Sequence, residues 1–302
     1  MYDIIVAGDY CLDLIFTGLP AFPRLGVEVV ATAFRMTPGG AYNPAAAMHR
    51  LGLRVGWAAD FGDDDFSRFV LEHARDEGLD PALFVHHKRP LRQITVAASY
   101  PEDRAFIAYY DPAPAVPAAA AALVRATARA VHLPALAHDS LFAAGRLLVR
   151  AKGMKLLMDG NSHEDVSLAD AEVRQAIASV DLFLPNALEV RRLTGEQDLE
   201  RGMGLLAGLV PLLVVKDGAG GAYACQGGTV LHEPALTLTP LDTTGAGDCF
   251  DAGFIAAWLE GRPLRECLQW GNVVGGLSTE GMGGTGRVVR REEVEERLRH
   301  KE

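Results

Sequence analysis

The sequence predicts an α/β protein in which helices cover both faces of a mostly parallel sheet in three layers, with a small β lid added. Strand-like runs and helical patterns alternate along most of the chain, which implies parallel strands joined by helical crossovers. The 302 residues, 49% of them hydrophobic, suit one sizeable domain. A β-rich hairpin pattern interrupts the alternation. We therefore expect a single domain over 1–302, with a lid formed by about 12–36 and 91–110.

The first part of the chain supplies elements of both the body and the lid. Asn43 and Pro44 suit the N-cap and first position of a helix that Gly52 would end. Two β-rich runs joined by residues 100–104 are typical of an antiparallel hairpin. The elements expected here are a strand over 3–7, half-exposed strands within 21–36, a helix over 43–51, a strand over 55–59, a helix over 62–78, and hairpin strands over 93–99 and 105–109.

The second part returns to the alternation of strands and helices, and we find no internal repeat or long linker in it. Its last helix is expected after the glycines near residue 245 and is ended by Gly261 and Pro263. The other elements expected here are helices over 117–129, 139–152, 169–179 and from 187, and strands over 130–133, 155–159, 181–184, 212–216 and up to 225.

Composition narrows the class of protein. A formal net charge of −10 argues against a nucleic-acid or anionic-membrane partner. The four cysteines show neither metal-binding spacing nor a disulfide framework. The N-terminus lacks a signal-peptide pattern, and no apolar run reaches transmembrane length. We therefore expect a cytoplasmic protein with small-molecule ligands.

The stretch Asp242-Thr243-Thr244-Gly245-Ala246-Gly247-Asp248 is the most informative in the chain. Its glycine-rich turn leads into a helix whose unpaired N–H groups and positive dipole end would bind an anion. Asp248 falls in the first turn, where a carboxylate beside an anion hole can act as a general base for a hydroxyl. The simpler interpretation is a helix whose first-turn acid is favourable on dipole grounds alone.

Three other motifs each have a structural and a functional interpretation. Gly39-Gly40 before Asn43 forms either a tight turn or a backbone that touches a ligand. Pro185-Asn186-Ala187-Leu188-Glu189 is typical of a capping box and also supplies oxygen ligands. Lys216 and the glycines of 218–221 form either a β-turn with a solvated lysine or a phosphate contact.

Two nucleotide-binding fingerprints are excluded. The run from Gly281 to Gly286 fits GxGxxG, but it follows a predicted helix rather than a strand. The chain contains no GxxxxGK[ST] motif, which argues against a P-loop enzyme.

The string D-T-T-G-A-G-D-C-F-D-A-G-F closely resembles the C-terminal signature of the ribokinase-like (PfkB) carbohydrate kinases, and the resemblance extends from Gly8 to about Gly286. It implies ATP-dependent phosphorylation of a hydroxyl on a small sugar, with Asp248 as the general base. The amides of Gly245, Ala246 and Gly247 would stabilise the transferring phosphoryl group. The residues matching the family's acceptor-binding positions are Asp13, Gly39, Gly40 and Asn43.

The same resemblance implies cofactors and a partner. Glu189 would hold Mg²⁺ through water. Asp242 and Thr244 match positions where members of the family often bind a monovalent cation, so K⁺ is a candidate ligand there. The lids of such kinases often pair, which implies a homodimer. The residues matching ATP-binding positions are Asn186, Lys216, Gly218, Gly221 and Asn272.

Two departures leave the acceptor open. The chain has GGxxN where GGxxxN is commoner, and Cys11 stands where ribokinase carries an asparagine. A nucleoside kinase of the same family and a non-catalytic sugar or nucleotide sensor remain alternatives, and a screen of acceptors would separate them. Arg92 and Arg104 on the lid are either solvated or in contact with substrate or phosphate.

Overall fold

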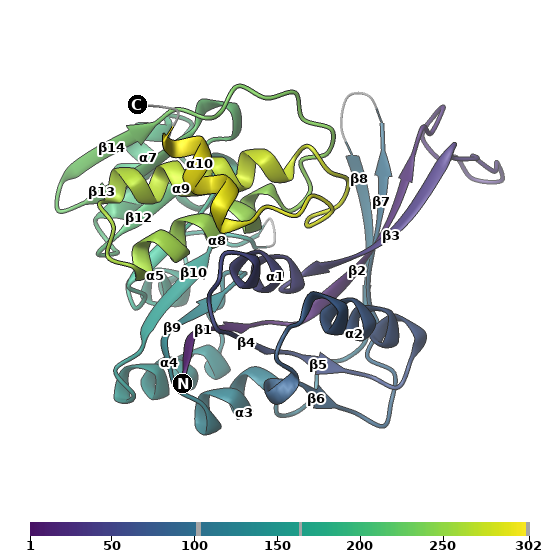
Figure 1. Ribbon diagram of the computed structural model, residues 1–302, viewed down its shortest axis with the longest axis horizontal. Helices are drawn as coiled ribbons and strands as arrows, with labels where there is room; N and C mark the ends of the chain where they lie inside the picture. The colour runs from purple at the N-terminus through teal and green to yellow at the C-terminus, as the bar shows by residue number, and fades with distance from the viewer. Residues whose placement is uncertain (101–103, 163–164, 300–302) are drawn as a thin grey trace.

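The computed structural model describes residues 1–100, 104–162 and 165–299; residues 101–103 of the hairpin connection expected over 100–104 lie outside them. An eight-stranded sheet forms the centre of the molecule (Figure 1). Its strands are parallel from β4 to β12, and the last two are antiparallel. In spatial order they are β14 (Thr229–Glu233), β13 (Ala222–Gln226), β12 (Leu213–Lys216), β11 (Leu182–Leu184), β10 (Lys155–Asp159), β9 (Ala128–Leu133), β1 (Tyr2–Ala7) and β4 (Val55–Ala58).

Strand β1 shows why helices cover both faces. Ile4 and Val6 belong to one hydrophobic core, with α1, α2, α8, α9 and α10, whereas Ile5 and Ala7 belong to a second core, with α3 to α7. The helices are α1 (Tyr42–Arg50), α2 (Asp65–Glu77), α3 (Ala118–Arg125), α4 (Ser140–Ala151), α5 (Ala171–Ile177), α6 (Ala187–Thr194), α7 (Leu199–Ala207), α8 (Ala246–Leu259), α9 (Leu264–Ser278) and α10 (Arg291–Arg299), with 3₁₀ turns at Pro81–Leu83 and Gly218–Gly220. The predicted three-layer α/β fold is therefore correct.

Helices α8 and α9 approach each other closely because glycines line their contact. A Cβ at Gly253 would lie 2.6 Å from the Trp270 carbonyl oxygen, and one at Gly275 would lie 2.9 Å from that of Ala246. Only glycine permits this backbone approach. The packing fixes the N-terminus of α8 against the rest of the body.

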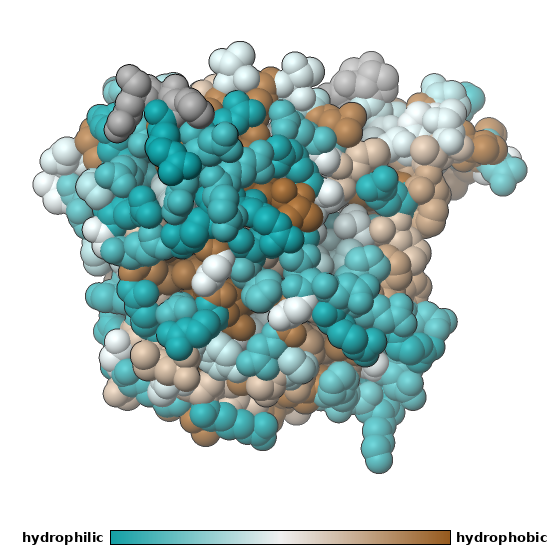
Figure 2. All heavy atoms as spheres, viewed as in Figure 1, coloured by the Kyte–Doolittle hydropathy of each residue, from teal (hydrophilic) through white to brown (hydrophobic). Residues whose placement is uncertain are grey.

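A second, four-stranded sheet stands beside the body, at the right of Figure 1. Large apolar side chains, among them Phe34, Phe106, Ile107 and Tyr110, are exposed on it, and apolar residues gather over this part of the surface in Figure 2. Its strands are, in order, β3 (Ala33–Gly40), β2 (Tyr10–Thr17), β7 (Gln93–Ser99) and β8 (Arg104–Tyr110); a small separate sheet pairs β5 (Asp60–Phe61) with β6 (Val85–His86).

Several local predictions differ from the structure. Asn43 does not cap α1, because the cap position is Ala41. The Asn43 side chain instead donates a hydrogen bond to Asp248. The segment 10–17 forms strand β2, although no strand was expected there, because it pairs with both β3 and β7. Most of 21–32 is not strand. No helix within the described residues is long and apolar enough to cross a membrane.

Candidate active site

The N-terminus of α8 carries the predicted anion-binding turn. Gly245 precedes the helix with φ of +67°, and a Cβ there would lie 2.5 Å from Gly284 Cα, so the position requires glycine. Within the described chain the amides of Gly245 and Gly247 have no hydrogen-bond acceptor, whereas that of Ala246 donates to the Thr243 carbonyl at 3.3 Å. Two of the three predicted amides are therefore available to an anion.

Asp248 lies in the first turn of α8 and is half-buried. Burial raises its pKa to about 7, and the negative charge of Asp159 adds to the effect. Asn43 Nδ2 donates a hydrogen bond to Asp248 Oδ2 at 3.0 Å, which together with the Lys216 ammonium opposes the rise. A carboxyl with a pKa near neutrality, held by an amide donor, is suited to accept a proton from a hydroxyl.

A cavity of about 570 Å³ opens beside this turn. Its apolar part is formed by Leu236, Leu238 and Phe250, and its polar part by carboxylates, amides and the backbone of the turns. Such a mixture is typical of a small-molecule binding site. Of the predicted residues, the cavity is lined by Asn186, Glu189, Lys216, Gly218, Gly221, Gly245, Ala246, Gly247, Asp248 and Asn272.

Lys216 is buried beneath the glycine turn rather than solvated. Its Nζ lies 2.6 Å from Asp159 Oδ2 and 3.0 Å from Asp251 Oδ1. Burial alone would lower the pKa of the ammonium, but the two carboxylates hold it well above its ordinary value. The ammonium lies 3.7 Å from where a Cβ of Gly247 would be, so a fixed positive charge supports the anion-binding turn.

Asn186 and Glu189 form the predicted capping box at the start of α6. The Asn186 side chain accepts from the Glu189 amide at 2.9 Å, and Glu189 Oε2 accepts from the Asn186 amide at 2.8 Å. Burial raises the pKa of Glu189 to about 7, and the nearby charge of Asp159 adds to this rise. The cap thus also holds the Glu189 carboxyl group toward the cavity.

This donor set fits Mg²⁺. Asp159, Glu189 and Asp248 line the cavity, with Lys216 as the single ammonium among its lining residues. Hard oxygen donors in excess of positive charge favour a divalent cation, above all beside phosphates. In the described part of the chain, no three His, Cys, Asp or Glu side chains group to enclose a metal ion, so water would complete its coordination.

The predicted acceptor residues Asp13, Gly39 and Gly40 lie where β2 and β3 pair, and Asn43 follows them in α1. A Cβ at Gly39 would lie 2.3 Å from Asp13 Oδ2, so the carboxylate lies directly over this glycine. Burial raises the pKa of Asp13 to about 6. Cys11 Sγ lies 3.0 Å from the Thr95 hydroxyl beside it. The hydrogen bond that Asn43 Nδ2 donates to Asp248 connects this region to the glycine turn before α8.

Asp242 and Thr244 belong to a loop that contacts the four-stranded sheet. Asp242 Oδ1 accepts from the Thr244 amide and hydroxyl at 2.9 and 2.7 Å, and Oδ2 accepts from the Gly283 amide at 2.8 Å. Arg104 from β8 bonds Asp242, at 3.1 Å, and the hydroxyls of both threonines. Arg104 is therefore not a solvated charge, and the Asp242 carboxylate is already held by donors of the protein. A role of these residues toward K⁺ stays a prediction.

Sequence reasoning missed some of these residues. Asp159 ends β10 at the same sheet edge as the other site residues, a position that points to a ligand site in open α/β sheets. Asp251 follows Asp248 by three residues in an otherwise apolar helix, and an acid at such a buried position indicates a buried partner. Arg92, just before β7, forms a bidentate ion pair with Asp111, just after β8. Arg92 is not among the residues that line the cavity.

The fold and the site define a small-molecule kinase of the α/β class. The chain belongs to the pfkB family of carbohydrate kinases, whose sequence profile matches residues 1–289. Members of this family transfer a phosphoryl group to a hydroxyl acceptor and use ATP, so this chain is a phosphotransferase of that kind.

The similarity to known proteins covers most of the chain. It is 26% identical to the ribokinase of Bacillus subtilis, over 99% of this chain and 100% of that protein. It is 30% identical to a fructokinase of Klebsiella pneumoniae, over 72% of this chain and 76% of that protein. The structure of Arabidopsis thaliana ribokinase, complexed with ribose and ATP, shares the fold with a TM-score of 0.84 at 20% identity and 98% coverage of both chains.

Proposed function

We propose that this protein phosphorylates a primary hydroxyl of a small sugar with ATP and that Asp248 is the general base. The observation that carries the proposal is the Asp248 carboxyl, with a pKa of about 7, beside the free amides of Gly245 and Gly247. The carboxylate would accept the hydroxyl proton as the oxygen attacks the γ-phosphorus. The amides and the helix dipole would stabilise the charge on the transferring group.

The cavity supplies the ATP site in this proposal. Leu236 and Leu238, with Asn272 beside them, would hold the base, and the turn at Gly218 and Gly221 would follow the ribose and phosphates. Asn272 is positioned by hydrogen bonds to the carbonyls of residues 233 and 234, at 3.0 and 3.1 Å. Lys216 would act from below the glycine turn, as a fixed counter-charge to the phosphates.

Glu189 would hold Mg²⁺ through water, with Asn186 and Asp159 beside it. When bound, Mg²⁺ neutralises charge on the β- and γ-phosphate oxygens. The chain's own contribution is the capping box, which fixes the orientation of the Glu189 carboxylate before any ligand arrives.

Asp13, Gly39, Gly40 and Asn43 would position the acceptor. Asp13 accepts hydroxyl hydrogen bonds, and Asn43 Oδ1, which is buried without a hydrogen-bond partner in the described structure, offers a further acceptor. Holding the hydroxyl in line with the phosphate supplies much of the rate.

The four-stranded sheet would act as the lid over this acceptor. Arg104 already joins it to the loop of Asp242 and would keep the closed position, which excludes water and suppresses ATP hydrolysis. The apolar side chains exposed on this sheet, among them Phe106 and Ile107, favour pairing with the lid of a second copy.

ADP release measured over a panel of sugars and nucleosides tests the proposal. We expect turnover with at least one sugar, and a loss of about 10²–10⁴-fold in Asp248→Asn with nucleotide affinity retained. Asp65→Asn, which changes an exposed first-turn acid on α2, is the matched control. Turnover with nucleosides alone would replace the sugar by a nucleoside, and binding without ADP formation on any acceptor would favour a sensor.

A further inference from the structure

Asp242 is a largely buried carboxylate on the loop that leads into the glycine turn before α8. Its side chain is 12% exposed. Thr243, the next residue, lines the proposed ATP cavity together with Gly245, Ala246 and Gly247. An uncompensated negative charge at this place would be costly to bury and would repel the phosphates of a nucleotide. The loop therefore requires a positive charge beside Asp242.

The four-stranded sheet supplies this charge through Arg104, the first residue of β8. Arg104 Nη1 lies 3.1 Å from Asp242 Oδ1 and also donates a hydrogen bond to the Thr244 hydroxyl. Arg104 Nη2 donates to the Thr243 hydroxyl at 3.0 Å. One guanidinium group, which keeps its charge at any pH used in an enzyme assay, therefore contacts each residue of 242–244.

Both oxygens of Asp242 have further donors. Oδ1 accepts from the amide and the hydroxyl of Thr244, and Oδ2 accepts from the Gly283 amide at 2.8 Å. Burial by itself would raise the pKa of Asp242, but these hydrogen bonds and the guanidinium charge together hold it below its ordinary value. Asp242 is therefore an ionised carboxylate that protein groups already satisfy.

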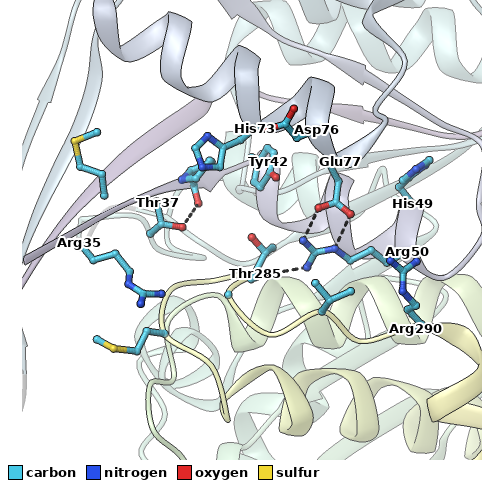
Figure 3. A pocket seen from close by; sticks show the side chains of 15 residues that line it. Arg35, Thr37, Tyr42, His49, Arg50, His73, Asp76, Glu77, Thr285 and Arg290 are labelled. Atoms are coloured by element: carbon cyan, nitrogen blue, oxygen red, sulfur yellow. Dashed lines mark hydrogen bonds and ion pairs between the residues drawn. The ribbon is translucent and has the colours of Figure 1, made fainter.

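The segment that carries Gly283 is itself held in place. Figure 3 shows this segment from the cavity on its outer side, where Arg50 of α1 donates to the Thr285 carbonyl at 3.0 Å. On the inner side it packs against the candidate catalytic site, since a Cβ at Gly284 would lie 2.4 Å from Asn43 Nδ2. The Gly283 donor thus belongs to the body of the protein, whereas the guanidinium group comes from the four-stranded sheet.

This arrangement does not fit a K⁺ ion at the side chains of Asp242 and Thr244. The sequence makes both residues candidates for a monovalent cation, but Arg104 Nη1 bonds a side-chain oxygen of each. A cation held by these two oxygens would lie within a few ångströms of the guanidinium group. Because like charges repel strongly at such a distance in a part-buried place, the guanidinium group and a bound K⁺ exclude each other there.

We propose that Arg104 takes the place of a monovalent cation at this loop, so that nucleotide binding by this protein does not depend on K⁺. The guanidinium group neutralises Asp242 and holds Thr243, whose carbonyl accepts from the Ala246 amide in the glycine turn. Arg104 is thus a positioning residue that acts through the loop and not on the reacting atoms. The inference rests on the proposed function for the nucleotide as ligand, and it involves no phosphoryl transfer.

Calorimetry on the full chain tests this proposal as the Kd of ADP in KCl and in choline chloride at equal ionic strength. We expect the two Kd values of wild type to agree within about twofold. In Arg104→Gln the Kd should be at least about fivefold higher in choline chloride than in KCl, because K⁺ can then reach Asp242. Arg104→Lys keeps the charge and should show no such difference. Arg35→Gln, which changes an exposed arginine on β3 of the same sheet, is the matched control and should behave as wild type.

Thermal unfolding of the same proteins without nucleotide is a second measurement that needs neither ADP nor activity. The Tm of Arg104→Gln should be higher in KCl than in choline chloride, since an ion that binds only the folded loop stabilises it. Wild type and Arg104→Lys should have the same Tm in both salts.

A dependence of wild type on K⁺ in either measurement would overturn the proposal, and this comparison stands even if Arg104→Gln does not fold. An Arg104→Gln protein that folds and responds equally to both salts would overturn it as well. If wild type failed to bind ADP in either salt, the proposed function would be wrong, and the Tm comparison would still decide the role of Arg104.

Discussion

Replacing Asp248 by asparagine should make the protein more stable while it removes activity. Burial and the charge of Asp159 raise the pKa of this carboxyl from 3.8 to about 7, which means that the folded state disfavours its ionised form. Asparagine has nearly the same shape, carries no charge, and can still accept the hydrogen bond from Asn43 Nδ2. The variant therefore keeps the contact and loses the penalty.

The size of the effect follows from the pKa. A rise from 3.8 to about 7 corresponds to about 4 kcal/mol at neutral and higher pH. The side chain retains partial contact with water, so we expect the variant to gain about 1–3 kcal/mol in the free energy of unfolding at pH 8.

The sign of the pH dependence is fixed by proton uptake. Between pH 3.8 and 7 the unfolded carboxyl is ionised while the folded one holds a proton, so wild type loses stability as pH rises through this window. The advantage of the variant should be largest at pH 8 and should shrink steadily toward pH 4.5.

Urea unfolding of both proteins at pH 4.5, 6 and 8 measures this difference. Asp65→Asn, with its exposed carboxylate in the first turn of α2, should show no such gain at any pH. If Asp248→Asn were no more stable than wild type at pH 8, or gained equally at pH 4.5, the assignment of a penalised ionised carboxylate would be wrong.

Three further predictions concern the same site. The kcat/KM of wild type should rise about tenfold per pH unit up to about 7 and then level off, since Asp248 must lose its proton; a profile flat from pH 5 to 8 would contradict this. Lys216→Met should lower the free energy of unfolding by about 3–5 kcal/mol in urea titrations, because it leaves buried carboxylates unpaired. Lys155→Met, which removes an exposed ion pair with Asp181, should cost less than about 1 kcal/mol in the same measurement. Gly245→Ala should lower turnover at least tenfold and destabilise more than Gly227→Ala, where φ is also positive (+56° against +67°) but the space around the residue is open. Equal effects of the two substitutions in thermal melts and ADP assays would exclude the close contact as the cause.

The sequence alone predicted those features that depend on neighbours along the chain. The period of the apolar residues predicted the layered α/β body, and the spacing of Asn186 and Glu189 predicted their capping box. The glycines before Asp248 predicted a helix N-terminus that carries an acid in its first turn. Each of these follows from backbone geometry within a few residues.

The tertiary structure alone decided which distant residues meet. Asn43 would make a good helix cap on local grounds, yet its side chain bonds Asp248, 205 positions away. Lys216 ends an ordinary strand in the sequence, but the sheet places it between Asp159 and Asp251 in a buried triad. A second cavity, of about 470 Å³, likewise exists only because β3, α1, α2 and the segment before α10 converge. Patterns along the sequence indicate the period of the apolar residues and the helix caps. Contacts between distant residues depend instead on how the packed layers bring separate segments together.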